Sequence, residues 1–241
     1  MTYELYYWPA NQGRGEFVRL ALEYAGASYI DVARESEQAG AGLPALLRLL
    51  GNEDVSYAPF APPFLKAGDL LIAQTANILQ FLSTLHALAP ADEATRLWIH
   101  QLQLTITDFV VEIHDTHHPI ASSLYYEEQK REAERRAKDF RENRLPKYLG
   151  YFEQALTRNP LGDHLAGDVT SYADLSLFQV IAGLRYAFPQ TMARIEGGYP
   201  RLTGLHDRIR ALPRISAYLS SERRIPFNQQ GIFRHYQELD P

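Results

Sequence analysis

Strand-forming patterns are confined to the first third of this 241-residue chain, and that uneven distribution constrains the fold more than any other feature. Four short runs rich in tyrosine or aliphatic residues, bounded by glycine or proline, predict strands at 2–8, 29–32, 64–66 and 70–72. Helical spacing of apolar residues fills the longer intervals, so the predicted order is β-α-β-α-β-β-α. We therefore expect residues 1–86 to form one small α/β domain.

Beyond residues 87–92, the apolar residues recur at helical spacing alone. Five helices are predicted, at about 98–113, 140–156, 172–187, 201–211 and 214–220. The second should be kinked or interrupted at Pro146, because proline has no backbone N–H to donate inside a helix. Ser171 and Asp174 have the spacing of a capping box at the start of the third. The sequence thus predicts an all-helical domain over 92–241.

Composition narrows the functions that such a chain can perform. With no cysteine, the protein cannot form disulfides or thiolate zinc sites, and it cannot supply its own thiol nucleophile. A net charge of −5 argues against a dedicated nucleic-acid binder, which needs a concentrated basic surface. No run approaches the roughly 20 apolar residues of a membrane span, and the N-terminus lacks a signal-peptide pattern. We therefore expect a globular, cytoplasmic protein that binds neither membranes nor nucleic acids.

Two motifs at the ends of the predicted strands carry a more specific signal. Tyr6-Tyr7-Trp8-Pro9 closes the first strand and is followed by Gly13-Arg14. Pro63 opens the third strand, Gly68-Asp69 lies in its turn, and Gln74-Thr75 begins the next helix. The motifs and the domain order resemble the cytosolic glutathione transferases, of bacterial type and nearest to the tyrosine-type classes. The resemblance covers nearly the whole chain and implies a thioredoxin-like N-terminal domain followed by a helical C-terminal domain.

The resemblance assigns the catalytic role to Tyr7, at the end of the first strand. An ordinary thiol has a pKa of about 8.5, so the glutathione thiol is mostly protonated at neutral pH. A hydroxyl that donates a hydrogen bond to the sulfur favours the reactive thiolate. Asn11 is the rival, because some bacterial relatives activate the thiol, or reduce glutathionyl disulfides, with a small polar residue just after the first strand.

The resemblance assigns the middle of the glutathione molecule to Pro62 and Pro63. Pro63 takes the position of the family's cis proline, and cis peptides are essentially confined to proline. In the family, the residue before this proline bonds the cysteinyl backbone through both its N–H and its C=O. Pro62 has no N–H, so either one of these bonds is lost or Pro62 is shifted.

Four other residues are implied in glutathione binding. Gln74 and Thr75 match the pair that binds the γ-glutamyl end, where a helix N-terminus offers unpaired N–H groups and Thr75 adds a hydroxyl. Arg14 belongs to the first motif, and Asp108 lies where some classes extend an acidic residue toward glutathione across a dimer. The residues that bind the glycyl carboxylate are not identified, because 36–61 does not align with the family.

The helical domain supplies candidates for the pocket of an apolar co-substrate. They are His118, Tyr125, Tyr126 and Phe233. The aromatic tail that contains Phe233 either folds over this pocket as a lid or packs in the core.

Three histidines, His114, His117 and His118, have a spacing that places two of them on one helical face. No carboxylate motif of a known type accompanies them, and Pro119 should end the helix. We therefore predict no metal site in this chain.

Together these features predict a homodimeric transferase that conjugates the glutathione thiolate to a small apolar electrophile, with glutathione as co-substrate. One alternative keeps the glutathione site but reduces disulfides or peroxides, with Asn11 as a principal donor. The other alternative is a non-catalytic ligand-binding protein of the same fold. It is motivated by the proline at position 62 and by the unidentified contacts to the glycyl carboxylate. The sequence does not identify the electrophile.

Overall fold

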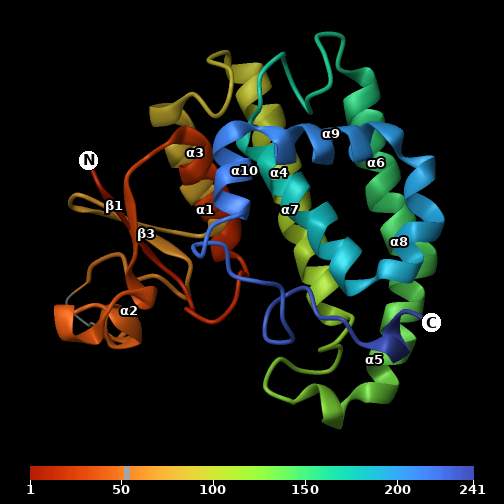
Figure 1. Cartoon of the computed structure of the whole chain (residues 1–241), viewed down its shortest axis with the longest axis horizontal. Helices are drawn as coiled ribbons and strands as arrows, with labels where there is room; N and C mark the ends of the chain where they lie inside the picture. Colours follow the sequence, from red (N-terminus) through yellow and green to blue (C-terminus); the bar gives the residue numbers. More distant parts are fainter. Residues whose placement is uncertain (52–54) are drawn as a thin grey trace. The chain divides into compact units, whose positions relative to one another are not determined.

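The structure, a computed structural model, describes residues 1–51 and 55–241 of the chain (Figure 1). The described residues form two compact units. The first combines Met1–Leu88 with Pro213–Pro226, and the second combines Ala89–Leu212 with Phe227–Pro241. Residues 52–54, within the segment that the sequence predicts to be irregular, lie outside the described part.

A four-stranded sheet forms the centre of the first unit. Its strands are β1 (Tyr3–Tyr6), β2 (Tyr29–Asp31), β3 (Phe64–Ala67) and β4 (Leu70–Ala73), in the spatial order β2-β1-β3-β4. β1 pairs in parallel with β2 and antiparallel with β3, and β3 pairs antiparallel with β4. This is the mixed sheet expected of a thioredoxin-like domain, and each predicted strand is present.

Helices pack on both faces of this sheet (Figure 1). The three that follow its strands are α1 (Gly15–Ala25), α2 (Gly42–Leu50) and α3 (Thr75–His86). On one face, the rings of Tyr6 and Phe64 stack with their centroids 4.8 Å apart and pack against Leu46 of α2. Because side chains alternate along a strand, the fully buried Leu5 and Leu65 point to the opposite face, toward α1 and α3.

A fourth helix of the first unit comes from far along the chain. α10 (Pro213–Leu219) packs on α1, and the Tyr218 hydroxyl donates to the Glu16 carboxylate at 2.7 Å. Arg224, which follows α10, forms an ion pair with the same carboxylate. The structure therefore differs from the predicted division at 92–241, because helical periodicity does not show which core a helix joins. These buried partners of α1 place the segment with the first unit.

Helices supply the long regular elements of the second unit: α4 (Glu93–Asp115), α5 (Lys130–Asp139), α6 (Leu145–Arg158), α7 (Tyr172–Ala187), α8 (Pro189–Ile195) and α9 (Pro200–Ala211). α7 is the most buried of them and packs against α4, α8 and α9. Within the described part of the chain, no helix is both long and apolar enough to cross a membrane.

The predicted interruption near Pro146 is present, but it precedes the proline. Phe140–Arg144 forms a π-helical segment between α5 and α6. Pro146 takes the first turn of α6, where its missing N–H removes no helical hydrogen bond. α8, a helix of 7 residues, is not among the helices that the sequence predicts.

The predicted capping box begins α7 and is fully buried. Ser171 Oγ accepts from the Asp174 N–H at 3.4 Å, and the Asp174 carboxylate accepts from the Ser171 N–H at 2.8 Å. The same carboxylate accepts from the Leu165 N–H at 2.8 Å. Burial raises the pKa of Asp174, and these hydrogen bonds oppose the rise. The box therefore fixes the preceding loop as well as the helix start.

The C-terminal segment is held against the second unit, where it lies beside α5 and α8 (Figure 1). The buried Asp240 carboxylate accepts from the N–H of Gln190 at 2.7 Å and of Thr191 at 3.1 Å, so a residue from the end of the chain caps α8. Phe233 covers Gly183 of α7, where an added Cβ would overlap the phenyl ring. The tail is thus packed through both polar and apolar contacts.

Candidate active site

Chain topology brings the ends of three strands to one edge of the sheet. The last residue of β1 pairs with the first residue of β3, and that residue pairs with the last residue of β4. The next residues outward along these strands are Tyr7, Pro63 and Gln74. α1 follows β1 and α3 follows β4, so both helices have their N-termini at this edge. The sequence-predicted residues of the first unit therefore gather in one place.

Tyr7 is 6% exposed and lies just beyond β1. Its hydroxyl oxygen accepts a hydrogen bond from the Arg14 N–H at 2.8 Å. Arg14 immediately precedes α1, so this N–H belongs to the unpaired group at a helix N-terminus. Because the oxygen serves as acceptor here, the hydroxyl hydrogen can be donated to a second partner.

Two glycines allow Tyr7 to lie this close to α1. A Cβ on Gly13 would overlap the tyrosine hydroxyl, and Gly13 also has a φ of +44°, which favours glycine. A Cβ on Gly15 would lie 2.5 Å from the Cγ of Tyr7. The glycine of the Gly-Arg motif is therefore required by the packing of the tyrosine as well as by the turn into the helix.

The surroundings of Tyr7 keep its hydroxyl protonated at neutral pH. Burial raises the pKa of Tyr7 above its ordinary value, and the Arg14 N–H and the positive charge of Arg19 oppose the rise. The Arg19 guanidinium lies 5.8 Å from the centroid of the Tyr7 ring and is itself paired with Glu16 and Asp31. Tyr7 is therefore suited to donate a hydrogen bond rather than to act as a base.

The N-terminus of α3 presents a buried hydroxyl and an unusual backbone conformation. Gln74 has a φ of 68° and a ψ of 121°, which non-glycine residues rarely adopt. Thr75 Oγ1 is buried and has no hydrogen-bond partner within the described part of the chain. A buried hydroxyl without a partner costs free energy, and such groups and backbone outliers concentrate at functional sites. Both features are typical of a functional site.

Between these two helix ends, the Pro62–Pro63 peptide bond is cis, as the motif predicts. Pro63 is buried and Pro62 is half-buried. Pro62 can offer a ligand only its backbone carbonyl, because proline has no N–H. Asn11, the rival of Tyr7, is half-buried in the connection between β1 and α1, so both candidates for thiol activation come from the same short segment.

The candidates of the helical domain have varied surroundings. Asp108 is exposed on α4, and Tyr125 is 77% exposed. Tyr126 is 3% exposed, stacks on Tyr236 with ring centroids 3.8 Å apart, and donates its hydroxyl hydrogen to a carboxylate of the tail at 3.0 Å. Phe233 is equally buried. The contacts of Tyr126 and Phe233 are those of packed residues, the alternative that the sequence leaves open for the tail.

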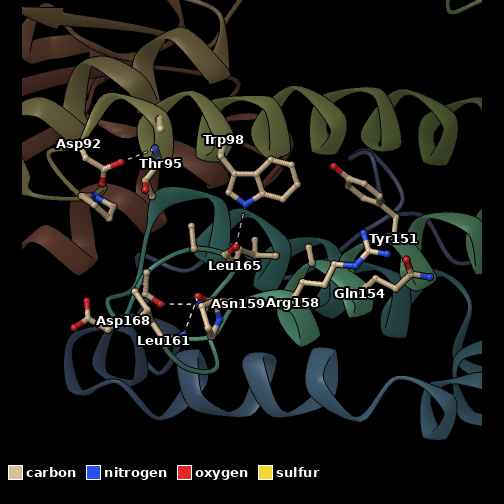
Figure 2. Close-up of a pocket in the computed structure, with 16 residues that line it drawn as sticks. Asp92, Thr95, Trp98, Tyr151, Gln154, Arg158, Asn159, Leu161, Leu165 and Asp168 are labelled. Carbon is tan, nitrogen blue, oxygen red and sulfur yellow. Dashed lines mark hydrogen bonds between the residues drawn. The ribbon is translucent and has the colours of Figure 1, made fainter.

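A cavity of about 580 Å³ lies in the second unit among residues that the sequence does not single out (Figure 2). Trp98 forms one wall and donates its indole N–H to the Leu165 carbonyl at 3.2 Å, while Tyr151 and Arg158 of α6 line another part. The rest of the lining comes largely from the loop 159–168. Because this loop has neither helical nor strand periodicity, no sequence pattern connects it with Trp98.

Comparison with known proteins gives consistent matches. Residues 114–222 match the family model described as "Glutathione S-transferase, C-terminal domain". The chain is 24% identical to a glutathione S-transferase of Plasmodium falciparum over 225 residues, which cover 91% of this chain and 95% of that protein. It is 28% identical to glutathione S-transferase P 2 of Bufo bufo over 233 residues, covering 95% of this chain and 98% of that protein.

Solved structures show the same fold. The Pi-class glutathione S-transferase of Onchocerca volvulus superposes with a TM-score of 0.72 at 22% identity, over 95% of this chain and 99% of that one. A prostaglandin synthase D of Nilaparvata lugens superposes with a TM-score of 0.70 at 22% identity, over 94% and 100%. The C-terminal part of this chain, residues 114–222, therefore matches the glutathione S-transferase family, and nearly the whole chain is similar to proteins named glutathione S-transferases.

Proposed function

We propose that this protein conjugates the glutathione thiolate to a small apolar electrophile. The observation that carries the proposal is the buried Thr75 hydroxyl, which lacks a partner within the described residues and lies at the same sheet edge as the Tyr7 hydroxyl. The γ-glutamyl carboxylate accepts from Thr75 and from the N–H groups at the start of α3, where the helix dipole also favours an anion. This anchors one end of glutathione while its thiol reaches Tyr7.

The spacing of the sheet suits a ligand of this length. Neighbouring strands lie about 4.8 Å apart, so β1 and β4, which are separated by β3, lie about 10 Å apart. An extended tripeptide spans about the same distance, roughly 10 Å. A tripeptide anchored at Thr75 is therefore long enough to extend past the carbonyl of Pro62 to Tyr7.

In the proposed mechanism, Tyr7 donates its hydroxyl hydrogen bond to the glutathione sulfur and stabilises the thiolate after the thiol proton has left to solvent. Arg14 orients this donor through the hydrogen bond that its N–H makes to the tyrosine oxygen. The thiolate then forms a carbon–sulfur bond with the electrophile, which either loses a leaving group or takes up a proton. Each unit by which the thiol pKa falls corresponds to about 1.4 kcal/mol. Among the residues that the structure describes, no comparable contact orients Asn11.

We also propose that the protein acts in the cytoplasm as a homodimer that uses α4. Leu97, Leu104 and Val111 recur every seven residues on this helix and are 62%, 48% and 43% exposed. Asp108 follows Leu104 by four residues, so it lies on the same side of the helix. A second copy would cover this apolar stripe. Light scattering should give twice the chain mass of 27.4 kDa, and a monomer at micromolar concentration would contradict the proposal.

Replacing Thr75 by valine tests the proposed function. Thr75→Val should raise the KM for glutathione about ten- to hundredfold, because hydrogen bonds to charged groups are worth about 1.5–3 kcal/mol. It should not lower stability, since valine keeps the shape and removes a hydroxyl that has no partner within the described residues. Initial rates of conjugation to a chlorodinitrobenzene, measured against glutathione concentration, give the KM.

The controls come from the same helix and the same position. Thr84→Val removes an exposed hydroxyl of α3 and should leave the KM unchanged, while Thr75→Ser keeps the hydroxyl and should restore most of the affinity. An unchanged KM in Thr75→Val would remove the γ-glutamyl assignment. Wild-type protein that forms no conjugate and binds no glutathione by calorimetry would overturn the proposed function itself.

A further inference from the structure

Three histidines lie together in the second unit, where α4 ends. His114 is in the last turn of α4, and His117 and His118 follow within four residues. Each can offer one ring nitrogen, and the three nitrogens lie within 4.8 Å of one another. The ring centroids of each pair are 4.8 to 5.0 Å apart. The proposed glutathione chemistry uses none of these nitrogens.

His117 is held in an orientation that turns one nitrogen toward the cluster. It is 1% exposed, and its Nε2 lies 2.8 Å from the Ile232 carbonyl oxygen. A carbonyl can only accept, so Nε2 carries the hydrogen and Nδ1 is unprotonated. This Nδ1 lies 2.5 Å from the Nδ1 of His118. A histidine that ligates a metal typically donates its other N–H to such a carbonyl or to a carboxylate.

We propose that His114, His117 and His118 together bind one divalent transition-metal ion, with zinc as the best-suited metal. Imidazole nitrogen is a good ligand for zinc, copper, nickel and iron, whereas magnesium and calcium prefer oxygen. Three nitrogen ligands leave the fourth tetrahedral position to a water molecule. Because the chain has no cysteine, thiolate ligands cannot compete for the ion.

The geometry requires one small adjustment. Two nitrogen ligands of a tetrahedral zinc ion lie about 3.3 Å apart, given zinc–nitrogen distances of about 2.0 Å. The Nδ1 atoms of His117 and His118, now 2.5 Å apart, must therefore move apart by less than about 1 Å. The hydrogen of His118 must also move from Nδ1 to Nε2, so that Nδ1 can bind the ion. His118 is half-buried and can rotate outward, whereas His117 stays fixed by the Ile232 carbonyl.

The charges around the cluster are compatible with a bound cation. A carboxylate oxygen of Asp115 lies 3.6 Å from His114 Nδ1. The negative charge of Glu127 also interacts electrostatically with His118. Near the same histidines, Arg234 contributes one positive charge, which partly offsets the two negative charges.

This proposal differs from the sequence-based prediction of no metal site because the group that orients His117 lies far away in the chain. The orienting carbonyl belongs to Ile232, which lies 115 residues from His117 in the chain. A pattern of three histidines without a carboxylate motif gives weak evidence for a metal. The backbone carbonyl takes the orienting role that a carboxylate would otherwise have.

Cobalt titration of the full chain, carrying no affinity tag, tests the site. Co²⁺ should bind at one ion per chain and give the strong visible absorption of a tetrahedral complex, which Zn²⁺ should abolish. His114→Gln and His118→Gln should each weaken binding at least tenfold, because each removes one of three ligands. His100→Gln, on the same helix but outside the cluster, is the matched control and should bind as the wild type does.

A measurement on the wild type keeps the test independent of how the variants fold. Proton NMR with Co²⁺ should shift the imidazole signals of three of the 8 histidines and leave the other imidazole signals in place. The proposal is overturned if the cobalt spectrum stays that of the hydrated ion, or if the shifted signals come from other histidines. Equal weakening in His100→Gln and His118→Gln would also overturn it.

Discussion

Tyr7→Phe should lower kcat/KM for glutathione conjugation about ten- to hundredfold at neutral pH, because the glutathione thiolate loses its hydrogen-bond donor. The pH dependence of kcat/KM should move to higher pH by about one to two units, since the thiol pKa returns toward about 8.5. The KM for glutathione should change little, because the γ-glutamyl anchor at Thr75 is retained. Initial rates measured between about pH 5.5 and about pH 9 report both effects, because this range extends from well below to slightly above the ordinary thiol pKa of about 8.5.

The neighbouring tyrosine provides the control for this variant. Tyr6 precedes Tyr7 in the chain, but its hydroxyl donates to Glu4 at 2.7 Å on the opposite face of the sheet. Tyr6→Phe should therefore leave the pH profile in place. An unchanged profile in Tyr7→Phe, together with a shifted profile in Asn11→Ala, would assign thiol activation to Asn11 instead.

Glu16→Ala should lower the free energy of unfolding by about 3–5 kcal/mol, because it removes a carboxylate from a buried network that includes Arg19 and Arg224. Glu16 is fully buried in α1 and accepts from the Tyr218 hydroxyl at 2.7 Å. It also pairs with Arg19 at 3.3 Å and with Arg224. Urea denaturation followed by circular dichroism measures the loss.

The same substitution should also lower activity, since Glu16 lies in the first turn of α1, close to Arg14, whose N–H orients Tyr7. Glu35→Ala removes an exposed carboxylate of the same unit and should change the free energy of unfolding by less than about 0.5 kcal/mol. A loss of less than about 1 kcal/mol in Glu16→Ala would contradict the importance of this network, because breaking a buried pair normally costs several times more.

Much of the fold follows from local patterns in the sequence. The hairpin of β3 and β4 has its turn at Gly68, which has a φ of 62° and thus adopts a conformation that favours glycine. α7 begins and ends where the sequence predicts, because the buried capping box specifies its first residue. Local patterns do not show which other element each helix packs against. The placement of α10 against α1 depends on Glu16 and Tyr218, which are separated by 202 residues.

The candidate site is predictable to the same extent. The resemblance leads to Tyr7, Pro63 and Thr75, because the family motifs lie at or near the ends of strands that the sequence already predicts. The missing partner of the Thr75 hydroxyl and the hydrogen bond from Arg14 to Tyr7 appear only when the backbone is in place. The cavity beside Trp98 and the carbonyl that orients His117 combine distant segments, so the sequence gives no indication of either.

The pKa of the glutathione thiol on the wild-type protein shows directly whether Tyr7 activates this thiol. The ultraviolet absorbance of the thiolate, recorded as a difference spectrum during a pH titration of the complex, reports this pKa. We expect the bound thiol to titrate at least one unit below its ordinary pKa of about 8.5, and to return toward that value in Tyr7→Phe. A bound thiol that titrates at the same pH as glutathione in solution would contradict thiol activation by this site.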